Sequence, residues 1–178
     1  MLPLYIQGTD FFDEKTYKFI TVPSRTIQLE HSLISISRWE SKWKKPFLGE
    51  GKTREQTIDY IKCMTLTPNV DPMLYSCIGD KEIKQVQEYI DDPMTATWFK
   101  ERSRRPNYKI ITSEKIYGWM VQMNIPFECE KWHLARLLVL LQVCDEMNQP
   151  PKKRNRAESA ESMRKLNAAR RGRYHTRG

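Results

Sequence analysis

The stretch WHLARLLVLLQV, residues 132–143, is the strongest indication of the fold. Its spacing predicts a helix whose apolar side chains point in more than one direction. Helices that are apolar nearly all round are usually buried, so we expect this one to lie inside the body of the protein. Glu128 and Glu130 stand at its start, where acidic groups suit the helix dipole. The run is interrupted by Arg136 and Gln142 and is too short to span a bilayer.

The net charge of the chain comes from its last 28 residues. The 178 residues carry a net charge of +8, from 30 basic and 22 acidic side chains. Residues 151–178 hold ten of the basic and two of the acidic side chains, so the first 150 residues are neutral. Pro150 and Pro151 close the body. We therefore predict a mainly helical globular domain, residues 1–149, and a basic tail, residues 150–178, that is flexible or conditionally helical.

Five further helices are predicted upstream from apolar periodicity and capping signals. Thr53 and Gln56 form a capping box, Asp71-Pro72 starts a short helix, and Asp80 and Ser113 are expected N-caps. The expected helices cover about residues 33–46, 53–64, 71–79, 80–91 and 113–124. Residues 101–107, ERSRRPN, are expected to form an exposed loop.

The N-terminal third contains three extended runs. Residues 2–6, 17–22 and 26–29 alternate between apolar and polar side chains, and residues 8–10 and 13–15 are expected turns. The predicted fold class is therefore α+β, mainly α-helical, with a small N-terminal antiparallel β element followed by a helical bundle and a basic C-terminal extension.

No motif of a known catalytic chemistry is present. The sequence has no Gly-rich phosphate loop, no GxSxG and no HExxH, so we expect no enzyme and no cofactor. Cys129 and His133 are four residues apart and would share a helix face, but two ligands are too few for zinc. We therefore expect no metal site, buried cysteines, and a surface or capping role for His133. The four cysteines form no CxxC pair and no signal peptide is predicted, which favours a reducing cytoplasm.

Tryptophan and methionine supply a candidate partner-binding surface. Core packing is the favoured role for the tryptophans Trp39, Trp43, Trp119 and Trp132. Methionine side chains could also line an adaptable apolar groove. The candidate partner-binding residues are Trp119, Met120, Met123 and Trp132.

The basic tail has three open interpretations. It could meet the phosphates of nucleic acid, dock on an acidic protein surface, or serve only as a solubilising end. A helix over about residues 157–171 is predicted, although a lone helix of this length is marginal in water. The candidate contact residues are Lys152, Lys153, Arg154, Arg156, Arg164, Lys165, Arg170, Arg171, Arg173 and Arg177.

Several stretches resemble a family of tailed-bacteriophage morphogenesis proteins. They are ITSEKIYGWM (residues 111–120), NIPFECEKWHL (residues 124–134), and, in the tail, PPKK (residues 150–153) and KLNAARR (residues 165–171), with a weaker likeness over residues 25–47. Together they look most like a tail assembly chaperone.

This resemblance implies a non-enzymatic protein made in the cytoplasm of the infected host. Such chaperones bind the tape measure protein and help tail tube subunits assemble around it, and many families also make a longer frameshifted product. The basic tail is not explained by this role. The alternative is a structural virion component, such as a connector or tail-completion protein, whose tail contacts DNA or an acidic protein surface. A stand-alone nucleic-acid-binding regulator is a third interpretation, but it lacks a recognisable reading helix.

Overall fold

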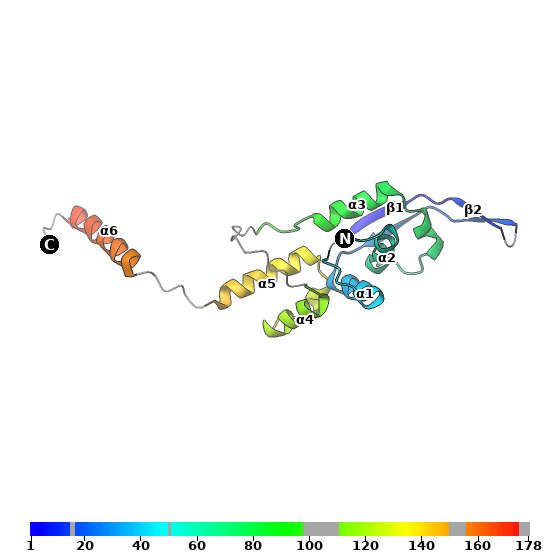
Figure 1. Ribbon diagram of the computed structural model, residues 1–178. Helices are drawn as coiled ribbons and strands as arrows, with labels where there is room; N and C mark the ends of the chain where they lie inside the picture. Colours follow the sequence, from blue (N-terminus) through cyan, green and yellow to red (C-terminus); the bar gives the residue numbers. More distant parts are fainter. Residues whose placement is uncertain (15–16, 50, 98–110, 150–155, 175–178) are drawn as a thin grey trace. The chain divides into compact units, whose positions relative to one another are not determined.

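The computed structural model describes residues 1–14, 17–49, 51–97, 111–149 and 156–174 (Figure 1). The chain divides into two units, Met1–Glu146 and Met147–Gly178. The α+β, mainly helical class is confirmed: a small antiparallel β element comes first and helices follow. The predicted loop at residues 101–107 and the pair Pro150-Pro151 lie outside the described residues.

The β element is a long two-stranded ribbon in two parts (Figure 1). β1 (Leu2–Ile6) pairs antiparallel with β4 (Arg25–Leu29), and β2 (Asp10–Asp13) pairs with β3 (Lys18–Thr21). Between the two pairs, a Cβ on Gly8 would lie 1.9 Å from the carbonyl oxygen of Val22, so this close crossing requires glycine.

The two parts of the ribbon differ in burial. Leu4 and Ile6 of β1 and Ile27 and Leu29 of β4 are fully buried, in the alternating pattern of a sheet with one covered face. All of β3 is exposed. The prediction missed β2 and assigned Asp10 to a turn, because two phenylalanines between acidic residues are too short a run to show alternation.

The two predicted helices after the ribbon both form, and the predicted capping box of the second is confirmed. α1 (Leu33–Trp43) begins with a capping box between Ser32 and Ser35, and α2 (Arg54–Met64) begins with the box between Thr53 and Gln56. α1 ends before Pro46, because Lys44 adopts a left-handed conformation with a φ of 54°.

A short 3-10 helix and α3 follow. The 3-10 helix η1 (Pro72–Cys77) has Asp71 at its N-cap, and the Asp71 carboxylate accepts a hydrogen bond from Met73 N. α3 (Asp80–Asp91) lies along β1 (Figure 1). The prediction of Asp80 as its cap is wrong by one residue, because Gly79 is the N-cap and Asp80 is already helical.

The last elements of the body are α4 (Ser113–Gln122), the 3-10 helix η2 (Phe127–Lys131) and α5 (Leu134–Asn148). The prediction of Ser113 as N-cap is wrong: Thr112 holds that position, and Ser113 instead donates two hydrogen bonds to Glu40. The expected burial of α5 on nearly all sides is also wrong. Its buried residues form one stripe, and much of the rest of the helix is half-buried.

One hydrophobic core joins the ribbon to the helices of the body. Its fully buried members come from β1, β4, α1, α2, α4 and α5. They are Leu4, Ile6, Ile27, Leu29, Leu33, Ile61, Met64, Ile116, Met120 and Leu137.

The second unit contains α6 (Arg156–Tyr174). This helix extends slightly beyond both ends of the predicted segment. Every side chain described in it, from Ala160 to Tyr174, is exposed.

Candidate partner-binding groove

A groove of about 400 Å³ lies between α4 and α5. Its size falls within the range of sites that hold small ligands or a few side chains. α4 and the residues beside it contribute one wall, and α5 contributes the other. The lining residues are Ile111, Trp119, Gln122, Met123, Leu138, Leu141, Gln142 and Asp145. Most of these side chains are apolar, and two glutamines and one aspartate add polar groups.

The α4 wall is held firmly against the body. Ile116 and Met120 are fully buried in the core. The Glu40 carboxylate accepts hydrogen bonds from Ser113 N at 2.8 Å and Ser113 Oγ at 2.5 Å. A buried carboxylate at a helix N-terminus also suits the helix dipole. The groove wall is therefore set by the core and by this cap together.

The α5 wall begins at a junction with β4 and α1. Leu134 N donates to the carbonyl oxygen of His31 at 2.7 Å, and His133 forms a bridge with Ser32. From this start Leu134, Leu137 and Leu141 form the buried stripe. Leu138 lies one residue past Leu137 and is half-buried at the groove. The groove is therefore lined by Leu138, which lies beside the buried stripe, and by Leu141, which belongs to it.

The structure brings together two of the four predicted partner-binding residues. Trp119, 37% exposed, and Met123 both line the groove. Met120 is fully buried in the core, so it supports the wall from behind. Trp132 is half-buried outside the groove, with the Arg136 guanidinium stacked over its ring at 4.4 Å from the ring centre.

The groove also contains apolar residues that were not predicted, namely Ile111, Leu138 and Leu141. The signal that could have found Leu138 was the excess of apolar residues in α5, since the buried stripe accounts for only part of them. Core packing is confirmed for Trp39, which is 1% exposed and donates from Nε1 to the carbonyl oxygen of Gln56 at 2.9 Å.

A buried polar cluster lies at the start of α5. His31 Nδ1 is 2.6 Å from the Tyr60 hydroxyl oxygen, which is also 3.2 Å from Ser35 Oγ. The rings of His31 and His133 meet edge-on, with centres 5.1 Å apart. Tyr89 contributes its carbonyl oxygen to His133 Nε2 at 3.1 Å. The cluster thus ties the β4–α1 junction to α2, α3 and α5.

Burial controls the protonation of this cluster. Burial, aided by the nearby His133 and Lys52, lowers the pKa of His31 to about 3. Burial also lowers the pKa of His133, against the opposing effect of its hydrogen bond to Tyr89. It raises the pKa of the Tyr60 hydroxyl. Both histidines are therefore neutral near pH 7, and within the described residues His133 Nδ1 is the one buried side-chain nitrogen or oxygen without a hydrogen-bond partner.

The expectation that Cys129 and His133 share a helix face is wrong. Cys129 lies in η2, and His133 follows that element and directly precedes α5. His133 is buried and not a surface residue, although its carbonyl oxygen accepts a hydrogen bond from Leu137 N in the first turn of α5. In the part of the chain that the structure describes, no group of three or more His, Cys, Asp or Glu side chains is placed to hold a metal ion.

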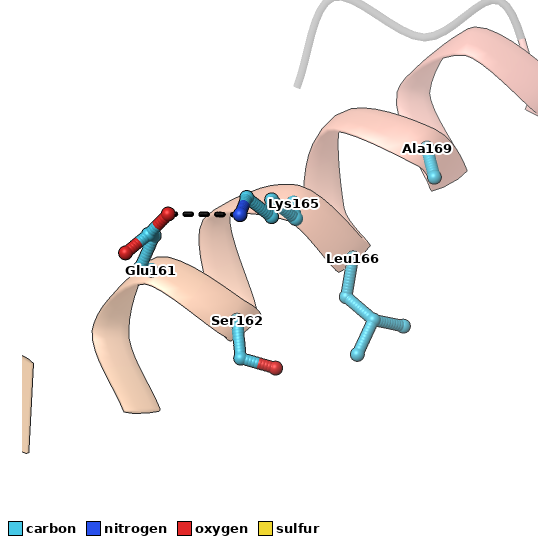
Figure 2. Close-up of a pocket in the computed structure, with 5 residues that line it drawn as sticks. All are labelled: Glu161, Ser162, Lys165, Leu166 and Ala169. Atoms are coloured by element: carbon cyan, nitrogen blue, oxygen red, sulfur yellow. Dashed lines mark ion pairs between the residues drawn. The ribbon is translucent and has the colours of Figure 1, made fainter. Parts of the chain in front are cut away.

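The described cations of the tail lie on α6. They are Arg164, Lys165, Arg170, Arg171 and Arg173, and Arg156 is the first residue of the same helix. Lys152, Lys153, Arg154 and Arg177 lie outside the described residues. Figure 2 shows a shallow hollow that this one helix lines by itself, with Glu161, Ser162, Lys165, Leu166 and Ala169. Glu161 and Lys165 form an ion pair there at 2.8 Å. A hollow on a single helix cannot enclose a ligand.

Among the described residues no helix has the length and apolar character needed to cross a membrane. Comparison with known proteins gives no identification: the chain matches no protein family, no curated protein and no solved structure.

Proposed function

We propose that this protein is a non-enzymatic assembly factor of a tailed bacteriophage, which acts in the host cytoplasm by holding a helical segment of a tail protein in the α4–α5 groove. The observation that carries the proposal is the groove itself, where Trp119, Met123 and Leu138 remain open to solvent or half-covered. A groove that presents apolar side chains in this way can accept the apolar face of an amphipathic helix. The sequence resemblance to tail assembly chaperones supplies the partner class, namely the tape measure and tail tube proteins.

The chemistry of the groove suits temporary binding. Methionine is flexible and polarisable, so it can adapt to different apolar side chains. The body is neutral, which means that binding does not depend on long-range attraction between charges. A tape measure protein is a long, largely helical chain, and the groove could shield its apolar stripes until tube subunits replace the chaperone.

Co-expression with the tape measure protein or tail tube protein of the same phage tests this function. We expect co-purification with the unaltered chain, and a loss of roughly 2 kcal/mol, about 30-fold in affinity, with Trp119→Ala. Val121→Ala is the matched control, because Val121 lies on the same helix, is 61% exposed and does not line the groove. Equal binding by Trp119→Ala and Val121→Ala would exclude the groove as the contact.

The alternative function is a structural virion component, and the exposed cations of α6 favour it. Such a component would stay in the finished particle, whereas a chaperone leaves. Mass spectrometry of purified virions separates the two: absence supports the assembly factor, and presence in a fixed number of copies supports the structural role.

A further inference from the structure

The charged side chains in the C-terminal half of α6 are all positive. Residues 164–174 include Arg164, Lys165, Arg170, Arg171 and Arg173 and contain no acidic residue. The acidic residues of α6, Glu158 and Glu161, both lie in its N-terminal half. All side chains of residues 164–174 are exposed. The charge of this stretch therefore favours a strongly anionic partner.

The cations are distributed around the whole circumference of the helix. At about 100° per residue, Arg164 and Arg171 fall on one side, since they are seven residues apart. Arg170 and Arg173 fall on the other side, and Lys165 projects between the two pairs. A flat anionic surface, such as a lipid bilayer or a protein face, would contact only one of these sides.

The major groove of a DNA duplex provides anionic groups on both sides of an inserted helix. It is about 12 Å wide and admits an α-helix, which then lies between the phosphates of the two strands. The small residues Ala168, Ala169 and Gly172 interrupt the long basic side chains, and a Cβ on Gly172 would meet no atom within 4 Å. This stretch of the helix is slim enough for close approach.

We propose that residues 164–174 bind duplex DNA by lying in its major groove and pairing with phosphates of both strands, without selecting a base sequence. Phosphate contacts position a protein but do not read sequence. Asn167 is the one carboxamide side chain in this stretch, so the bidentate contact of a carboxamide to adenine is available at one position only. This inference is independent of the function proposed for the α4–α5 groove.

Ordering of the helix should accompany DNA binding. Arg170 and Arg173 are three residues apart, and like charges at this spacing destabilise an isolated helix. The ion pair between Glu161 and Lys165 offsets this by only a fraction of a kilocalorie. Phosphates would remove the repulsion, so the helical signal in circular dichroism should increase when duplex DNA is added.

The test measures binding of the full chain to a fluorescent mixed-sequence duplex, by anisotropy over a range of salt concentrations. Two double variants remove one side each: Arg164→Gln with Arg171→Gln, and Arg170→Gln with Arg173→Gln. Each double variant should make the negative slope of log K against log salt shallower by about 2. Each should also weaken binding roughly 10- to 100-fold at about 0.1 M salt. Lys81→Gln with Lys84→Gln is the matched control, because both lysines are exposed on α3, and its slope should be unchanged.

Three results would overturn the inference. An effect of only one of the two double variants would show a flat contact and exclude insertion in the groove. Unchanged binding by both variants would place the DNA contact elsewhere. Binding to polyglutamate, but not to duplex DNA, would identify an acidic protein as the partner of the tail.

Discussion

At the scale of single residues, the buried histidine pair explains how the start of α5 is held. His31 and His133 pack edge-on, and each makes one hydrogen bond to a buried or partly buried partner. Neutral imidazole rings can be packed in this way, but a charged ring would lose its hydration, and for His133 the nearby carboxylates of Glu30 and Asp92 offset this loss only in part. Tyr60, the partner of His31, stays protonated because burial raises its pKa. The cluster therefore stabilises the fold only while both rings are neutral.

This protonation makes the stability of the body dependent on pH. The pKa of His31 is lowered from 6.5 to about 3, so below about pH 6.5 the unfolded chain binds a proton that the folded chain does not. Stability is therefore complete above this pH and is lost as the pH falls toward 3, at up to about 1.4 kcal/mol per unit from His31. His133 shifts in the same direction and adds to the loss.

Urea unfolding between about pH 5 and 6.5 measures this effect, in a window where most carboxylates stay ionised. His31→Gln retains a hydrogen-bonding group but cannot titrate. We therefore expect the free energy of unfolding of this variant to fall less steeply as the pH decreases, with a slope that corresponds to nearly one bound proton fewer. Tyr60→Phe serves as the control, because it removes the hydrogen bond and keeps both histidines. Parallel pH profiles for the unaltered chain and His31→Gln would contradict the assignment.

At the scale of elements, Glu40 connects α1 to α4. Its Oε1 accepts a hydrogen bond from Phe47 N at 2.7 Å, and its Oε2 accepts from the backbone and side chain of Ser113. The side chain is buried, although it carries a carboxylate. One residue thus holds both the turn after α1 and the first turn of the helix that carries Trp119.

Removal of this carboxylate should loosen both elements. Glu40→Ala leaves buried backbone donors of Phe47 and Ser113 without acceptors, and we expect a loss of roughly 2–5 kcal/mol in the free energy of unfolding. Glu40→Gln retains one side-chain oxygen and should lose less. Glu88→Ala, on the exposed side of α3, should change stability by less than about 0.5 kcal/mol. If Glu40→Ala lowered the free energy of unfolding as little as Glu88→Ala does, water molecules would be replacing the carboxylate as the hydrogen-bond acceptor.

Sequence patterns located the elements that depend on local interactions. The capping box at Thr53 involves residues three apart and was found directly. The cap of α4 was misplaced, because Ser113 is held by Glu40, 73 residues away, and no local pattern shows this contact. The groove residues were predicted only in part, because their position also depends on contacts between residues far apart in the sequence. Trp119 and Met123 stood out by residue type, whereas the role of Leu138 depends on which side of α5 the core covers.

At the scale of the whole molecule, charge and apolar burial are separated along the chain. Residues 1–150 are neutral and contain the hydrophobic core, while residues 151–178 hold the entire net charge. A helix with no buried side chain among those described contributes little to a core. The two units could therefore serve different partners, a tail protein for the groove and duplex DNA for α6.

This separation predicts that the body folds without the tail. Deletion of residues 151–178 keeps all of α5, and we expect the thermal midpoint to change by less than about 2 °C, the effect of roughly 0.5 kcal/mol in a chain of this size. Leu137→Ala is the contrasting variant, because this fully buried side chain fills the core and its truncation should cost about 2–5 kcal/mol. Differential scanning calorimetry compares the three proteins. If the deletion lowered the midpoint as much as Leu137→Ala does, the tail would be part of the folded body, and a free cationic helix could not be the DNA contact.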